Sequence, residues 1–93
     1  MSDTDIRYRM REALLAAMPV MRRSALDYLC CASIGGDPET IPPMEWAEIA
    51  PNLDAIILAE SCVGRISTGE GDDAWLDAIL DAGEWRKHRE ATI

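Results

Sequence analysis

Residues 53–66 read LDAIILAESCVGRI, a segment that is apolar around most of its circumference when projected as a helix. Only Asp54 and Ser61 mark a clear polar side. A helix that is apolar nearly all round belongs in a core, and a chain of 93 residues has few other elements with which to surround it. The segment therefore predicts a partner chain, and we expect a homodimer whose interface includes Ile56, Ile57, Leu58 and Glu60.

Glu60 falls inside the apolar arc of this segment. An unpaired carboxylate in an apolar setting is costly. Glu60 is therefore expected to pair with an arginine, which can belong to the partner chain. The alternative is that Glu60 lies at an edge of the apolar surface and reaches solvent.

Prolines and glycines divide the chain before this segment into helices. A first helix is predicted over residues 5–18, after the capping side chains of residues 2–4. Pro19 is expected to break or kink it, because proline lacks an N–H group, and to open a second helix that ends at Gly35 and Gly36. Pro51 is likewise expected to end a short helix over residues 44–50.

The last third of the chain predicts a Gly-rich turn over residues 67–71 and a final helix from Asp72 or Asp73 to about Arg89, with Gly83 as an alternative end. Apolar and polar residues never alternate for the length of a strand. We therefore expect one all-α domain over residues 1–93, a compact bundle of four to five short helices. Its tryptophans, Trp46, Trp75 and Trp85, are expected in the core or partly buried, and Trp85 alternatively as an interface anchor.

Negative charge is concentrated in one part of the chain. The net charge is −8, with 17 acidic residues against 9 lysines and arginines. Residues 37–84 hold twelve of those acids and a single base, Arg65, which makes this segment −11. Binding to DNA phosphates needs Lys and Arg, so this balance argues against a DNA-binding regulator that uses the five arginines of residues 7–23. It favours a basic partner, unless the acids serve only solubility.

Six carboxylates form a row along the predicted last helix and the turn before it. Asp73, Asp77, Asp81 and Glu84 fall within an arc of about 80° at about 100° per residue, and Glu70 and Asp72 extend the row. The row repeats about every 6 Å, which is comparable in scale to the roughly 3.4 Å between phosphates of a DNA strand. We predict a partner-binding face here. The alternative is the solvated outer face of an amphipathic helix.

Catalytic and metal sites are not predicted. Cys30, Cys31 and Cys62 lack a C-x-x-C spacing, and His88 is the only histidine, so a zinc site has too few ligands. The cysteines are expected to be reduced, small apolar residues of a cytoplasmic protein. The Gly-rich turn lacks a phosphate-binding motif and carries repelling acids. We expect no cofactor, no enzymatic activity and no membrane span.

In its small size, its acid-rich stretch over residues 37–84 and its lack of an enzyme signature, the chain resembles the acidic, phage-encoded anti-CRISPR proteins. The carboxylates from Glu70 to Glu84 carry most of this likeness. The resemblance implies a non-catalytic inhibitor in the cytoplasm of a bacterial host cell. Its acidic face would mimic DNA and block the nucleic-acid-binding surface of a defence complex, such as a CRISPR effector subunit. The basic first third of the chain departs from a uniform DNA mimic.

A second interpretation assigns the function to apolar surface. In it, the chain is a small helical adaptor or antitoxin-like dimer that binds its partner through the 53–66 helix, and the acids serve solubility. High salt would weaken the acidic inhibitor's complex and leave the adaptor's complex largely intact.

Overall fold

The helix α1 (Asp3–Ala32) is the longest element of the computed structural model, which describes residues 2–89. Its first turn is capped by Ser2, whose Oγ accepts a hydrogen bond from the N–H of Asp5. Asp3 and Asp5 complement the positive end of the helix dipole. At the other end, the N–H of Ser33 donates to the carbonyl of Leu29 and closes the helix.

Pro19 lies inside α1, so the prediction of a break after Met18 is wrong. The proline removes one backbone hydrogen bond, the one to the carbonyl of Leu15. Met18 and Arg22, on either side of it, are buried against the rest of the domain. That burial holds the helix together through the proline, which itself lies on the exposed side.

The helix α2 (Pro43–Val63) also runs through a proline, Pro51, so the two helices predicted over residues 44–50 and 53–66 form one element. Ala50 and Leu53, beside the proline, are fully buried. Pro43 opens α2 at a position where a missing N–H costs nothing. Gly64, with φ +85°, ends it before the predicted Ile66.

The remaining elements are short. The 3-10 helix η1 (Pro38–Thr40) is capped by Asp37. The helix α3 (Gly71–Ala82) ends at Gly83, whose φ of +69° suits only glycine well, and η2 (Glu84–His88) follows as a 3-10 helix. Over the described residues the all-α prediction is confirmed, since no strand is present. In place of the predicted four to five short helices, residues 2–89 form three α-helices, two of them long, and two 3-10 helices.

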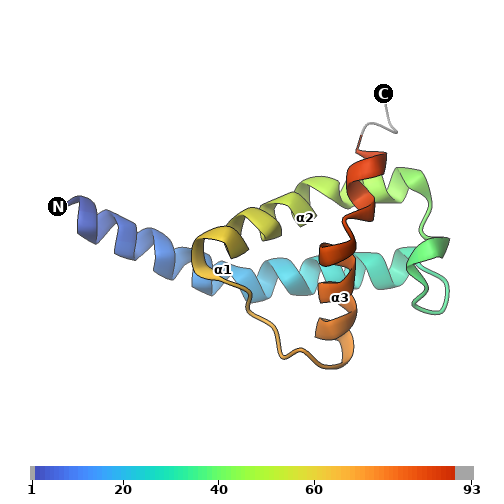
Figure 1. Ribbon diagram of the computed structural model, residues 1–93, viewed down its shortest axis with the longest axis horizontal. Coiled ribbons are helices and arrows are strands. Elements are labelled where there is room, and N and C mark those ends of the chain that lie inside the picture. The colour runs from blue at the N-terminus through green and yellow to red at the C-terminus, as the bar shows by residue number, and fades with distance from the viewer. Residues whose placement is uncertain (1, 90–93) are drawn as a thin grey trace.

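The core lies where α2 meets its neighbours. α2 packs against α1 on one side and against η2 on another, and α3 lies across α1 (Figure 1). The prediction that the 53–66 segment supplies core residues is confirmed by its buried side chains Leu53, Ile56 and Ala59. The largest fully buried side chains are Trp85, Met18, Leu29, Leu53, Ile56, Leu76 and Leu80.

The first half of α1 projects from this body as an arm, defined as residues 3–17 (Figure 1). No residue of the arm is buried, and among residues 2–89 the first buried one is Met18. The radius of gyration is 14.6 Å, against about 12 Å for a compact domain of this length. The arm accounts for this excess, since the molecule extends 48 Å along its longest axis.

Candidate functional site

A buried arginine connects the three α-helices. Arg22 on α1 is 4% exposed. Its guanidinium lies 2.8 Å from Oδ1 of Asp77 and 3.5 Å from Oε1 of Glu60. It also donates to the carbonyl of Asp73 at 3.4 Å and lies 3.5 Å from that residue's carboxylate. Arg22 thus joins α1 to α2 and α3, and its charge is matched by carboxylates of the same chain.

Arg65, just after α2, extends this network toward solvent. It donates to both carboxylate oxygens of Glu60 at 3.1 Å and to both of Asp81, at 2.9 and 3.2 Å. The hydrogen bonds from Arg65 hold the pKa of Asp81 below its usual value, and those same bonds raise the pKa of Arg65. The predicted arginine partner of Glu60 is therefore confirmed, and both arginines that it meets belong to its own chain.

The predicted acidic row divides into two groups. Asp73, Asp77 and Asp81 bind Arg22 and Arg65, although the Asp81 side chain stays 67% exposed. Glu84 pairs with Lys87 at 3.2 Å and His88 at 3.3 Å, which lowers its pKa. Glu70 and Asp72 are exposed, with no ion pair inside residues 2–89. Binding of a partner by this row stays a prediction, and within residues 2–89 Glu70 and Asp72 are its carboxylates that are both exposed and free of ion pairs.

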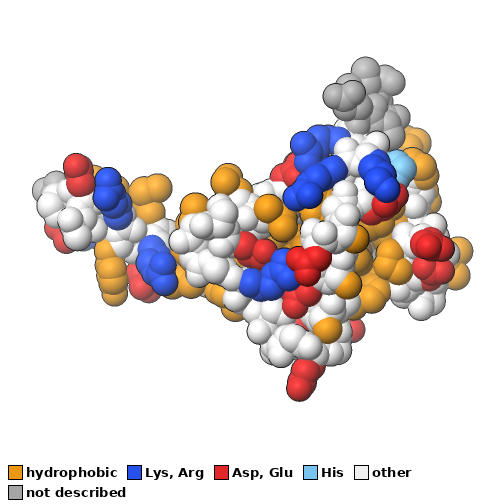
Figure 2. Space-filling view, in the orientation of Figure 1, with side chains coloured by type: hydrophobic (Ala, Val, Ile, Leu, Met, Phe, Trp, Pro, Cys, Tyr) orange, Lys and Arg blue, Asp and Glu red, His pale blue; other side chains and the backbone are white. Residues whose placement is uncertain are grey.

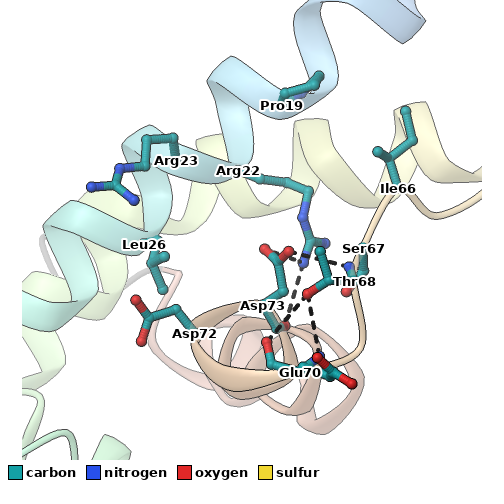
Figure 3. Close-up of a pocket in the computed structure, with 10 residues that line it drawn as sticks. All are labelled: Pro19, Arg22, Arg23, Leu26, Ile66, Ser67, Thr68, Glu70, Asp72 and Asp73. Carbon is teal, nitrogen blue, oxygen red and sulfur yellow. Dashed lines mark hydrogen bonds and ion pairs between the residues drawn. The ribbon is translucent and has the colours of Figure 1, made fainter.

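A cavity of about 470 Å³ lies beside the Arg22 network, between α1 and the start of α3. Figure 3 shows Arg22 pointing from α1 toward Asp73, whereas Arg23 points away. The Asp73 carboxylate accepts the N–H of Thr68 at 3.2 Å. That bond, with help from Arg22, lowers the pKa of Asp73. Within residues 2–89, every buried side-chain polar atom has a partner, so the cavity presents no buried unmatched group to a ligand, and the carboxylates of Glu70 and Asp72 in its lining are exposed.

A larger, mostly apolar groove lies on another part of the surface, between the 33–43 segment and α3 with η2. Its volume is about 1030 Å³. Figure 2 shows hydrophobic side chains between these elements. The apolar walls of the groove are formed by Ile41, Pro43, Trp46, Trp75, Ala78, Ile79 and Ala82. Carboxylates of Asp37, Glu39 and Glu84 stand at its edge, together with His88.

Hydrogen bonds shape the wall formed by the 33–43 segment. Trp75 on α3 donates from Nε1 to the carbonyl of Gly36 at 2.8 Å. The Thr40 hydroxyl accepts the N–H of Ile34 at 2.7 Å and donates to the carbonyl of Asp37 at 2.6 Å. These bonds fold the segment back on itself and join it to α3.

The tryptophans behave largely as expected. Trp46 and Trp85 are buried, at 2% and 0% exposure, and Trp75 is half-buried. Trp85 donates from Nε1 to Asp54 at 3.0 Å, inside the body. Its alternative role as an interface anchor is therefore wrong, because its ring is already covered by its own chain.

The residues predicted for a dimer interface lie on different sides of α2. Ile56 is fully buried and Ile57 half-buried. Glu60 binds Arg22 and Arg65. Leu58 alone among the four is widely exposed, at 68%. The dimer itself stays a prediction, and of these side chains Leu58 offers the largest free surface.

The three cysteines are free, as the expectation of reduced cysteines requires, and all three are exposed. Cys30 and Cys31 lie on the outer side of α1, and Cys62 follows Ser61 in the last turn of α2. Across the part of the chain that the structure describes, no three potential ligands gather as a metal site. No helix there is both long and apolar enough to cross a membrane.

Comparison of the chain with protein-family models, with curated proteins and with solved structures found no match.

Sequence reasoning missed the groove as a site. Its walls come from three separate segments, and none of them carries a motif. The one sequence signal was the pair of exposed turns, Gly35-Gly36 and Pro42-Pro43, on either side of an acidic loop. Such a pattern predicts a loop without indicating that two tryptophans lie beneath it.

Proposed function

We propose that this chain is a protein-binding module that takes a helical segment of its partner, apolar on one face and basic at the edges, into the apolar groove. The observation that supports this most directly is the groove's composition. Its walls are largely apolar and include Trp46 and Trp75, and three carboxylates stand at its edge. Amphipathic helices bind other proteins by placing their apolar face in such grooves.

The size and charge of the groove support this class of ligand. Its volume of about 1030 Å³ lies just above the range typical of small-molecule sites, roughly 300–1,000 Å³. Glu39 is exposed and makes no ion pair within residues 2–89. A cationic side chain at the edge of the ligand would therefore find a free carboxylate, which adds specificity and faster association.

The acidic inhibitor of a nucleic-acid-binding complex remains a second proposal, supported by the exposed carboxylates of Glu70 and Asp72 and by the net charge of −8. Charge reversal at Asp77 is a poor test of it, because that change also leaves Arg22 buried without its nearest partner. Reversal of Glu70 and Asp72 to lysine removes acidic surface without touching the network. Unchanged, salt-resistant binding of a basic partner by that variant would exclude DNA mimicry by this face.

The groove is tested with a synthetic helical peptide that has Leu and Met on one face and Arg at both edges. Two of the three tryptophans line the groove, so binding is followed by intrinsic fluorescence. We expect saturable binding, at least tenfold weaker for a matched peptide with Glu in place of Arg. The groove variant Ala78→Arg places a bulky cation at an exposed, groove-lining position of α3.

The matched control is Ala55→Arg, at an exposed position of α2 outside the groove lining. We expect Ala78→Arg to weaken peptide binding by at least tenfold and Ala55→Arg to leave it unchanged. Equal binding by both variants, or absence of binding by the unaltered chain in its monomeric form, would overturn the proposed function.

A further inference from the structure

The arm carries an apolar stripe that its own chain covers only at the inner end, where Leu14 is half-buried against the core. At about 100° per residue, Ile6, Met10, Leu14 and Ala17 share one face within an arc of roughly 80°. Ile6 is 43% and Met10 61% exposed. Figure 2 shows hydrophobic and basic side chains next to one another along the arm. An apolar stripe of this kind on a projecting helix marks an interaction surface.

Two arginines stand beside the stripe. Arg7 and Arg11 follow Ile6 and Met10 by one residue each and lie along one edge of the apolar arc. Neither makes an ion pair within residues 2–89. The arm is thus apolar on one face and basic at its edge, which is the chemistry that the groove would accept.

The arm cannot reach the groove of its own chain. The groove is lined by Gly35 and Gly36, just beyond the C-terminal end of α1. Ile6 and Ala32 are separated by 26 residues of continuous helix, or about 39 Å at about 1.5 Å per residue. The two surfaces therefore lie toward opposite ends of one continuous helix. Only a second copy can bring the arm and the groove together.

We infer that the arm of a second copy occupies the groove, and that two chains exchange arms reciprocally in a closed dimer. This inference rests on the proposed function and names the occupant of the same groove. Charge complementarity supports it, because Arg7 and Arg11 would meet the carboxylates at the groove edge, Glu39 in particular. In reciprocal exchange, each chain's arm fills the other chain's groove. No arm or groove is left free, so the assembly closes at two chains.

The inference is tested by sedimentation equilibrium of full-length chains. The unaltered chain is expected to form a dimer that dissociates on dilution. Met10→Glu, on the apolar stripe, and Ala78→Arg, in the groove, are each expected to weaken self-association at least tenfold. Both positions are exposed in the single chain, so circular dichroism and melting temperature should stay close to those of the unaltered protein.

Each variant has a matched control. Tyr8 is 64% exposed, much like Met10, but lies about 160° further round the arm at about 100° per residue. Tyr8→Glu should leave the dimer intact. Ala55→Arg, on α2, should do the same. A 1:1 mixture of Met10→Glu and Ala78→Arg supplies one intact groove and one intact arm, so it should associate more strongly than either variant alone.

Other outcomes would overturn the inference. A dimer broken by Ala55→Arg but not by Ala78→Arg would place the interface on α2. A dimer broken by Met10→Glu but not by Ala78→Arg would indicate pairing of arm with arm. An unaltered chain that stays monomeric at all concentrations would also exclude the exchange of arms.

The proposed function is tested apart from this inference by titrating the Arg-edged peptide into the Met10→Glu variant, whose groove has no arm to fill it. If the peptide binds but the unaltered chain forms no dimer, the arm of a second copy is not the occupant of the groove, and the proposed function still stands. No binding to Met10→Glu would overturn the proposed function itself.

Discussion

Arg22 and Asp77 are joined by an ion pair of 2.8 Å across 55 positions of sequence, and the arginine is 4% exposed. The same guanidinium also reaches Glu60 on α2. A buried ion pair is costly to desolvate, and its formation adds little net stability over apolar packing. Removing one member is different, because it leaves the other charge buried without compensation. The network therefore makes the arrangement of the three helices sensitive to single substitutions.

Substitution of Arg22 by methionine should lower the free energy of unfolding by about 3–5 kcal/mol, because the carboxylates of Asp77 and Glu60 then lose their buried cation. Urea denaturation at neutral pH measures this. The control is Arg23→Met, next in sequence but 73% exposed, with a single i,i+4 ion pair to Asp27. That change should cost no more than about 0.5 kcal/mol. Equal losses for the two variants would contradict the structural role of Arg22.

Acid should destabilise the domain. Asp73, Asp81 and Glu84 have pKa values held below normal, chiefly by hydrogen bonds from Thr68, Arg65 and Lys87 respectively. A carboxylate with a lowered pKa in the folded state contributes stability above its unfolded pKa, which is 3.8 for these aspartates. That contribution is lost as the pH falls through the folded value. The urea midpoint should therefore decrease from about pH 5 to pH 3.

A single neutral substitution isolates part of this response. Asp81→Asn removes one of the carboxylates that pair with Arg65 and should reduce the decrease between about pH 5 and pH 3. Asp72→Asn changes a neighbouring exposed carboxylate that has no ion pair within residues 2–89, and it should keep the full decrease. An identical pH profile for Asp81→Asn and the unaltered chain would contradict the assignment.

Trp85 should be among the most sensitive positions of the core. Its side chain is fully buried and its Nε1 donates to Asp54. Trp85→Ala should cost about 3–5 kcal/mol, from lost apolar burial and the cavity left behind. Tyr8→Ala removes an aromatic ring that is 64% exposed on the arm and should change stability by less than about 0.5 kcal/mol. A small effect at Trp85 would mean that η2 is dispensable for the core.

Replacement of Pro19 by alanine should stabilise the chain, by up to about 3 kcal/mol, because it restores a backbone N–H inside α1 and removes a steric clash. Thermal unfolding gives the readout. The control is Pro42→Ala, at the N-cap of α2, where φ is −63° and suits proline. There the substitution should destabilise by about 0.4–1 kcal/mol through the unfolded state. A loss of stability for Pro19→Ala would show that the proline shapes the helix in a way that alanine cannot.

The fold class and the central helix could be predicted from sequence because both depend on local pattern. The 53–66 segment is apolar nearly all round, and it supplies buried side chains such as Leu53 and Ile56. The pairing of Glu60 with arginine followed from the cost of a buried carboxylate. Which arginine it meets could not be predicted, since Arg22 lies 38 positions away and on another helix.

The predicted helix boundaries at Pro19 and Pro51 were wrong for a different reason. Local propensity favours a break at Pro19 and Pro51, but each proline is flanked by buried residues whose packing outweighs one lost hydrogen bond. The acidic row was placed correctly on one face of α3. The arginines that pair with that face are Arg22 on α1 and Arg65 after α2. They could not be predicted, because only the tertiary structure brings them close to α3. The groove could not be predicted, because its walls meet only when the 33–43 segment folds back onto α3.

The arm has a consequence for the hydrogen exchange of its backbone amides. The arm packs against the core at its inner end, through Leu14, and a helical stretch of about 15 residues with so few tertiary contacts is only marginally stable in water. In a single chain, amides of the arm should therefore exchange quickly, while those from Met18 onward exchange slowly because global or sub-global opening is required. The boundary would fall at Pro19, where the helix already lacks one hydrogen bond. One continuous helix thus contains a fast-exchanging and a slow-exchanging half, and slower exchange in the first half would report directly that the arm is covered.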